Sequence, residues 1–312
     1  YFLGWTKGKP IDEVRFVQTS DDATVKALAE KGELGLSSHG LGNDTYEAIG
    51  KMDGYKLIQT RTAGGFVIKL NTKVYPTDDV HVRRAIAYAT DYKTIQEVIY
   101  PGFDMKGPLS DAFKDAHNDG IEPGVFDLEK AKEELAKSKY AGQPITLVNS
   151  YVASLAFEAE VALLLQANLE QIGITLDIKP EPWNRIVELS AKPETTPAST
   201  QVNVSPSYPS PDSMFYNQYH SKAAGTWWSM EWLQNPEIDA LIDKARGETD
   251  VSAQNATYKE LQTKIAELQP DVWAVAPNRR YGANKCLQGY AFIPMQSWDL
   301  NFSNFHWDCS AN

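Results

Sequence analysis

The segment from Asn71 to Gln96 constrains the fold of this chain more than any other stretch. It follows an apolar run, residues 66–70, that predicts a buried strand. Pro76 ends that strand, and Asp79 offers a carboxylate that can cap the first turn of a helix. Apolar residues then recur at helical spacing until Asp91 provides a second N-cap. The segment therefore predicts a buried strand that passes through a proline elbow into two successive helices.

A second unit, residues 144–204, has the pattern of a strand, a helix and a strand. Apolar residues occupy one face of a long helix that ends at Gly173, a residue suited to a helix C-cap. Residues 174–178 then alternate between apolar and polar, as a half-buried strand does. A right-handed crossover would place this unit in a mixed sheet with helices over its faces. The sequence thus predicts the α/β class.

Other segments give weaker signals. Val14 and Phe16 alternate with charged residues and predict a strand, and two strands around residues 63–65 predict a hairpin. Asn235 followed by Pro236 predicts the start of a helix, because proline suits the first helical position. Residues 271–277 predict a last internal strand.

The charge and cysteine content exclude several classes of protein. The 312 residues include 41 acidic and 30 basic ones, and a net charge of -11 argues against nucleic-acid and anionic lipid surfaces. No apolar run approaches the ~20 residues of a membrane span. The chain begins at Tyr1 rather than Met, so we expect that it was processed or is part of a longer chain. Cys286 and Cys309 could form one disulfide in an oxidising compartment or remain two thiols.

Metal and catalytic motifs are missing from the sequence. The His residues are scattered, and neither cysteine has a Cys-x-x-Cys neighbour, so we expect no metal site. There is no Gly-x-Ser-x-Gly elbow for a nucleophile. Acidic pairs such as Asp78 and Asp79 stand at helix starts, where capping explains them. We therefore expect neither catalytic residues nor a cofactor.

The segment described first resembles the signature of the family 5 extracytoplasmic solute-binding proteins of ABC importers, which include oligopeptide, dipeptide and nickel binders. Tyr92 stands where the family usually has Arg, and Gly35 where it usually has an acid. The resemblance continues through most of the chain in the family's order. The signature positions that match are Asp79, Val80, Val82, Arg83, Arg84, Ala85, Ala89 and Asp91.

This resemblance implies a periplasmic binding protein-like fold, with mixed sheets flanked by helices and two lobes joined by a hinge. Residues 1–70 and 280–312 would be part of an incomplete first lobe, and residues 71–279 would be the ligand-clamping lobe. It also implies an extracytoplasmic or periplasmic monomer, lipid-anchored in some full-length members. Such a protein captures a small solute and delivers it to ABC permease subunits.

The best candidates for ligand contact lie in residues 201–212, a strand and a proline-rich loop. In the resembled peptide binders this region carries an Asp for the peptide amine and an Arg for its carboxylate. Here Ser207 and Gln201 take those places. A peptide terminus would lose a charge-assisted bond, which costs roughly 2–5 kcal/mol. We therefore expect a neutral or sugar-like solute in preference to a free peptide.

Aromatic residues give a second indication, because 8 Trp and 15 Tyr are present and flat rings can stack on sugars or fill an apolar pocket. Any single Trp is equally well explained as core, and the loop as a turn stiffened by proline. An oligopeptide or dipeptide binder, and a cleft hydrolase with paired carboxylates, stay open as alternatives. The predicted ligand-binding residues are Tyr151, Trp183, Gln201, Asn203, Ser207, Tyr208, Asp212, Trp227 and Trp228.

Overall fold

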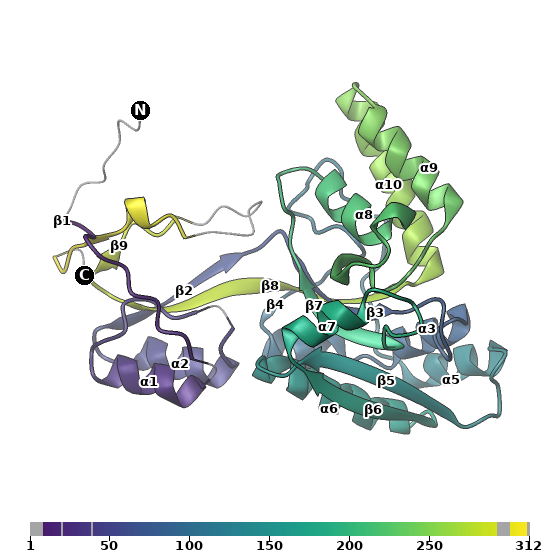
Figure 1. The fold of residues 1–312 in the computed structure, drawn as a ribbon, viewed down its shortest axis with the longest axis horizontal. Helices are drawn as coiled ribbons and strands as arrows, with labels where there is room; N and C mark the ends of the chain where they lie inside the picture. Colours follow the sequence, from purple (N-terminus) through teal and green to yellow (C-terminus); the bar gives the residue numbers. More distant parts are fainter. Residues whose placement is uncertain (1–8, 20, 39, 292–299, 311–312) are drawn as a thin grey trace.

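The computed structural model describes residues 9–19, 21–38, 40–291 and 300–310. Figure 1 shows two bodies of unequal size, with long strands running from one to the other. The larger lobe carries most of the sheet and most of the helices. The smaller lobe contains two helices near the N-terminus and the last part of the chain.

Among the described residues, seven strands form one mixed sheet in the order β2-β8-β3-β7-β5-β6, with β4 paired to β8. β5, β6 and β7 are parallel to one another, whereas β3 is antiparallel to both β7 and β8. A second, three-stranded sheet has the order β1-β10-β9. The strands are β1 (Lys9–Pro10), β2 (Tyr55–Arg61), β3 (Gly65–Leu70), β4 (Gly102–Phe103), β5 (Ile145–Val152), β6 (Ile174–Glu181), β7 (Ser199–Val204), β8 (Asp271–Asn284), β9 (Leu287–Gln288) and β10 (His306–Trp307).

The helices cover both faces of the large sheet and form much of the smaller lobe. The α-helices are α1 (Asp22–Glu30), α2 (Asn43–Lys51), α3 (Val80–Tyr88), α4 (Tyr92–Thr94), α5 (Leu128–Lys137), α6 (Ala156–Glu170), α7 (Trp183–Leu189), α8 (Asp212–Tyr219), α9 (Pro236–Gly247) and α10 (Val251–Leu268). Shorter turns are the π-helix η1 (Ile95–Ile99) and the 3-10 helices η2 (Ser221–Ala223), η3 (Trp227–Ser229) and η4 (Phe302–Asn304).

The signature segment folds as the sequence predicts. Asp79 begins α3 by accepting a hydrogen bond from the backbone N–H of His81 at 2.8 Å. Asp91 begins α4 in the same way, accepting from the N–H of Thr94 at 3.0 Å. Both carboxylates satisfy amide groups that a helix start leaves without an intrahelical partner. The chain therefore passes from β3 into two helices, the second of which continues as η1.

β3 explains why the larger lobe has two apolar cores. Phe66, Ile68 and Leu70 point to one face, where they pack with α3 and α6. Val67 points to the other face and packs with residues of α8, α9 and α10. This alternation follows from the two-residue period of a strand, and it places β3 in the centre of a helix-covered sheet.

The smaller lobe has a separate and smaller core. Its buried apolar side chains come from α1, α2 and the start of β2, and include Val25, Tyr46 and Ile49. β2 pairs along its whole length with the second half of β8, which joins this lobe to the larger one. The last residues of the described chain return here as β9 and β10.

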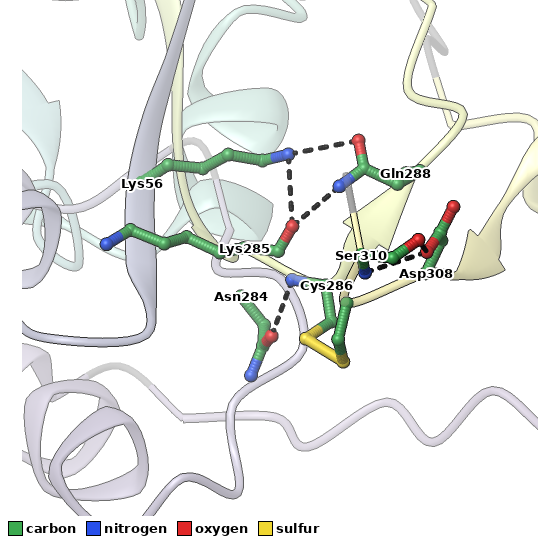
Figure 2. The surroundings of a disulfide bond; sticks show 8 residues. Lys56, Asn284, Lys285, Cys286, Gln288, Asp308 and Ser310 are labelled. Carbon is green, nitrogen blue, oxygen red and sulfur yellow. Dashed lines mark hydrogen bonds between the residues drawn. A yellow bond between two sulfur atoms is a disulfide. The ribbon is translucent and has the colours of Figure 1, made fainter. Parts of the chain in front are cut away.

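A disulfide bond joins Cys286, between β8 and β9, to Cys309 after β10. Figure 2 shows it beside a group of hydrogen bonds that ties β2 to this end of the chain. The Nζ of Lys56 donates to Gln288 Oε1 at 3.4 Å, and Gln288 Nε2 donates to the Lys285 carbonyl at 2.6 Å. The disulfide bond between Cys286 and Cys309 thus fastens the C-terminal segment to the smaller lobe.

Two sequence predictions about secondary structure are wrong. The strands around residues 63–65 form no hairpin, since β2 and β3 instead both pair with β8. Val14 and Phe16 lie in irregular backbone and are exposed, 40% and 79% respectively. A hairpin depends on which distant strand competes for the same hydrogen bonds, and local sequence does not show this.

The division of the chain at residue 70 remains a prediction. Because β3 packs within the larger lobe, we propose a boundary near residues 62–64 instead. Within the described ranges, the structure contains no helix that is both long and apolar enough to cross a membrane.

Candidate functional site

A cavity of about 220 Å³ lies where β8 leaves β3 and joins β2. It is found at the carboxyl ends of the parallel strands, where ligands bind in open α/β sheets. Leu155 follows the end of β5, and Val204 and Ser205 stand at the end of β7. The lining residues are Gly40, Thr62, Gly64, Gly65, Tyr100, Leu155, Phe157, Asn203, Val204, Ser205, Pro277, Asn278 and Arg279.

Two glycines allow the segment between β2 and β3 to pass beside the cavity. A Cβ on Gly64 would clash with the carbonyl oxygen of Val204, and one on Gly65 would clash with Met105. Absence of a side chain therefore lets the segment between β2 and β3 lie directly against the end of β7. The Gly doublet serves the crossing between lobes and borders the cavity.

Both lobes contribute to the cavity and touch beside it. Gly40 belongs to the smaller lobe, and its Cα lies close enough to Leu155 that an added Cβ would be 3.3 Å from Leu155 Cδ2. Near this contact, the Nδ2 of Asn43 on α2 donates to the carbonyl of Val98 in η1 at 3.1 Å. The cavity is therefore an interlobe space whose walls would move if the lobes rotated.

The aromatic wall is formed by Tyr100 and Phe157, whose rings stack with centroids 4.0 Å apart. The hydroxyl of Tyr100 donates to Asn203 Oδ1 at 3.3 Å. Burial raises the pKa of Tyr100, and nearby Glu158 raises it further, whereas Arg279 acts in the opposite direction. The hydroxyl therefore stays protonated and serves as a hydrogen-bond donor.

Arg279 is the only charged side chain among the described lining residues. It is half-buried on β8, opposite Thr60 of β2. A guanidinium group presents several N–H donors in a fixed plane and favours carboxylate partners. Together with Asn203, Ser205, Thr62 and Tyr100 it makes a site suited to holding a polar, carboxylate-bearing group.

The structure distributes the nine predicted residues over several places. Asn203 lines the cavity. Gln201, two residues earlier on β7, is fully buried, and its Nε2 donates to Asn149 Oδ1 at 3.0 Å. Tyr151 is half-buried near the end of β5, in register with Pro180 of β6. β7 thus brings Asn203 to the cavity, whereas the side chain of Gln201 on the same strand is hydrogen-bonded inside the sheet.

The loop after β7 lies beyond the cavity lining. Ser207 and Tyr208 are exposed, and the hydroxyl of Tyr208 donates to Asp212 Oδ2 at 2.5 Å. Asp212 also forms an ion pair with Arg246, with Oδ1 and Nε 3.0 Å apart. These side chains hold the loop on α8 and α9.

The predicted Trp residues form a separate cluster. The rings of Trp183 and Trp227 meet edge to face at 5.1 Å, and those of Trp227 and Trp228 stack at 4.4 Å. Trp183 opens α7 directly after the carboxyl end of β6 and is 40% exposed. The cluster therefore shares the carboxyl edge of the sheet with the cavity, and its contact with a ligand remains a prediction.

Sequence reasoning missed most of the lining residues, including Tyr100, Phe157 and Arg279. They come from segments far apart in the chain, so no local motif joins them. Gly64 and Gly65 belong to the segment for which the sequence predicts a hairpin, and in the structure they border the cavity. In the part of the chain that the structure describes, no group of three or more His, Cys, Asp or Glu residues could hold a metal ion.

Comparison with known proteins gives a consistent result. The family model described as "Bacterial extracellular solute-binding proteins, family 5 Middle" matches residues 1–226. The oligopeptide-binding protein AppA of Bacillus subtilis is 23% identical over 306 residues, which cover 92% of this chain and 55% of AppA. Heme-binding protein A of Haemophilus influenzae is 28% identical over 225 residues, which cover 69% of this chain and 40% of that protein.

Among solved structures, the periplasmic binding protein DppA of Helicobacter pylori, in complex with the peptide STSA, superposes with a TM-score of 0.83 at 20% identity. The match covers 92% of this chain and 55% of that one. It shows that the predicted α/β, periplasmic binding protein-like fold is correct. The chain spans about half the length of the relatives it matches, 55% of AppA and 40% of heme-binding protein A.

Proposed function

Because this chain belongs to family 5 of the bacterial extracellular solute-binding proteins, we propose that it is the solute-binding part of an ABC importer. A solute would enter the interlobe cavity, the lobes would close over it, and the closed form would deliver it to permease subunits. The family consists of binding proteins, and the proposed mechanism breaks no bond in the solute. Affinity would come from desolvation and from polar groups already in place.

We further propose that the solute carries a carboxylate and is a short peptide or one end of a longer one. This proposal rests on one observation, which is that the side chain of Arg279 lines the cavity. The sequence argument against peptides assumed that no other cation replaces the Arg that peptide binders carry at the position of Gln201. In the structure, β8 brings the guanidinium group of Arg279 to the cavity from another part of the chain. The preference for a neutral or sugar-like solute also lacks support among the relatives, which are named for oligopeptides and heme.

The size of the cavity is consistent with this ligand class. Pockets for drug-sized ligands measure roughly 300–1,000 Å³, and this one measures about 220 Å³. Such a space holds a small peptide or one terminus. Tyr100 and Phe157 offer apolar surface for a peptide backbone or side chain.

Replacing Arg279 with Gln tests this proposal. Binding of Ala-Ala and of its C-terminal amide would be measured by isothermal titration calorimetry on both proteins. Charge-assisted hydrogen bonds contribute about 1.5–3 kcal/mol, so R279Q should bind Ala-Ala roughly 10-fold to 100-fold more weakly. Binding of the amide should change little, because the amide lacks the carboxylate.

Arg84→Gln provides the matched control. Arg84 lies on α3 and donates to the carbonyl of Glu267 on α10, and it is not among the residues that line the cavity. This variant should bind both probes as the unaltered protein does. If R279Q and the unaltered protein bound Ala-Ala equally well, the role of Arg279 would be contradicted. If neither protein bound Ala-Ala, the peptide proposal itself would be contradicted.

A further inference from the structure

Tyr100 is held in the cavity wall by aromatic rings from two other elements. Its ring stacks on that of Phe157 in α6, with centroids 4.0 Å apart, and meets the ring of Phe66 in β3 edge to face at 5.8 Å. The rings of Phe66 and Phe157 also meet edge to face, at 5.4 Å. Aromatic pairs favour particular geometries, so three mutual contacts restrict how far the ring of Tyr100 can turn. The hydroxyl of Tyr100 therefore has a defined place in the wall.

This hydroxyl meets Asn203, which β7 places in the same wall. Asn203 lies opposite Phe66 in the pairing of β7 with β3, and the Tyr100 hydroxyl donates to Asn203 Oδ1 at 3.3 Å. Within the described ranges, Oδ1 is the only acceptor for that hydroxyl, and Asn203 Nδ2 has no hydrogen-bond partner. The pair thus leaves one donor group, Nδ2, available in a residue that lines the cavity.

The hydrogen bond also determines which end of the Asn203 carboxamide faces a solute. A carboxamide has an acceptor end and a donor end, so when Oδ1 is turned to Tyr100, Nδ2 is turned away from it. Rotating the amide by 180° would leave the Tyr100 hydroxyl proton without an acceptor, and an unpaired donor in a buried place costs more than a typical hydrogen bond contributes. Asn203 therefore presents N–H groups, rather than an oxygen, to the cavity.

The cavity then has N–H donors on two strands. Asn203 provides them on β7, and Arg279 provides them on β8. A solute that pairs with both must carry two acceptor groups, and only the one at Arg279 needs a negative charge. In a dipeptide the C-terminal carboxylate and the peptide carbonyl are a few bonds apart, which suits a cavity of about 220 Å³.

We propose that Tyr100 is a positioning residue, which holds Oδ1 of Asn203 so that the Asn203 N–H groups face the solute and select a carbonyl acceptor. The acceptor is the peptide carbonyl next to the carboxylate that Arg279 holds. This inference rests on the proposed function and adds a determinant of specificity to it. The site would favour an amide-linked solute over one with a donor at the same position.

Tyr100→Phe tests this role, because Phe keeps the ring contacts and removes only the hydroxyl. The probes are Ala-Ala and its reduced analogue, in which a methylene replaces the peptide carbonyl and the linking amine is a donor. Without the hydroxyl, the Asn203 amide can turn either end to the solute. By isothermal titration calorimetry, Y100F should bind Ala-Ala about 2-fold to 5-fold more weakly and the reduced analogue more tightly, so the preference for Ala-Ala should fall roughly 10-fold.

Tyr92→Phe is the matched control. The Tyr92 hydroxyl donates to the Ala87 carbonyl at 3.0 Å, and Tyr92 is not among the residues that line the cavity. Y92F should therefore keep the preference of the unaltered protein. In a protein that already carries Asn203→Ala, adding Y100F should leave the preference unchanged, because Tyr100 acts through Asn203.

Asn203→Asp provides a second variant that keeps Tyr100 in place. One carboxylate oxygen can still accept from the Tyr100 hydroxyl, and the other then faces the cavity as an acceptor. N203D should therefore reverse the selectivity and prefer the reduced analogue to Ala-Ala, measured with the same two probes.

The outcomes separate this inference from the proposed function. An unchanged preference in Y100F, or equal weakening of both probes, would overturn the positioning role. A preference of N203D for Ala-Ala would overturn it too, as would an effect of Y100F that persists after Asn203→Ala. In each of these cases, weaker binding of Ala-Ala by R279Q would leave the proposed function standing. Failure of the unaltered protein to bind Ala-Ala would overturn both.

Discussion

The two lobes of this chain are stabilised by different means. The larger lobe buries both faces of a sheet between helices, with an apolar cluster on each side. The smaller lobe has one small cluster among α1, α2 and β2, and it carries the disulfide. A small core buries little apolar surface and therefore contributes little to stability. The disulfide bond offsets this deficit by restricting the unfolded chain. A large core, in contrast, can enclose charged groups.

The larger lobe does enclose such a group on the face of β3 that carries Val67. Lys69 is fully buried, with its Nζ 3.0 Å from Glu231 Oε2, 3.6 Å from Asp271 Oδ1 and 3.0 Å from Gln218 Oε1. Burial raises the pKa of Glu231 to about 7, against the attraction of Lys69. The ammonium group therefore balances two carboxyl groups in the core.

Removing this ammonium group should produce the largest effect and should confine it to the larger lobe. Lys69→Met leaves two buried acids without their cation, and breaking a buried ion pair costs about 3–5 kcal/mol. The expected result is a lower unfolding temperature of the larger lobe by differential scanning calorimetry. Lys73→Met, at an exposed position four residues away, is the control. A change in stability no larger than that of the control would show that the core tolerates the unpaired acids.

Opening the disulfide should have a somewhat smaller effect, confined to the other lobe. The bond spans 23 residues, and a loop of that length contributes roughly 3 kcal/mol by restricting the unfolded chain. The variant with Cys286→Ser and Cys309→Ser should show faster hydrogen exchange in β9 and β10, with the larger lobe unchanged. Equal loss of protection in both lobes would show that the two bodies unfold as one unit.

The contact between the lobes should give the smallest effect. Asn43→Ala removes the hydrogen bond to the Val98 carbonyl, and such bonds contribute about 0.5–1.5 kcal/mol. It also removes an acceptor from Arg280, which keeps its 2.6 Å ion pair with Glu47. We expect a larger radius of gyration by small-angle X-ray scattering, with the melting temperature nearly unchanged. Lys51→Ala, at the exposed end of α2, should leave the radius as it is, and the same radius in both variants would contradict a closing role for Asn43.

Much of the local structure could be predicted from the sequence. Asp79 and Asp91 cap helices where the pattern places them. α6 ends at Glu170 with Gln171 as its C-cap, and Gly173, the predicted cap, lies two residues further on with a φ of 83° in the left-handed region. Asn235 accepts hydrogen bonds from the first turn of α9, with Pro236 in the first helical position. These features depend on residues a few positions apart, so the chain itself contains the information.

The candidate site could be predicted only in part. The strand containing Asn203 was found because the alignment with the family pointed to it. Arg279 was not found, since it belongs to an element whose local pattern shows only a strand. Its place in the cavity lining depends on which elements pack together, and residue spacing does not show this.

The sequence by itself determined the α/β class, the caps and periods of the main elements and the family resemblance, because these depend on local hydrogen bonds and on apolar spacing. The tertiary structure decided that β8 would pair with both β2 and β3, that the Gly doublet would cross between lobes, and that a cation on β8 would meet the end of β7. Those outcomes depend on competition among distant strands and on the shape of packed cores, which residue spacing does not encode.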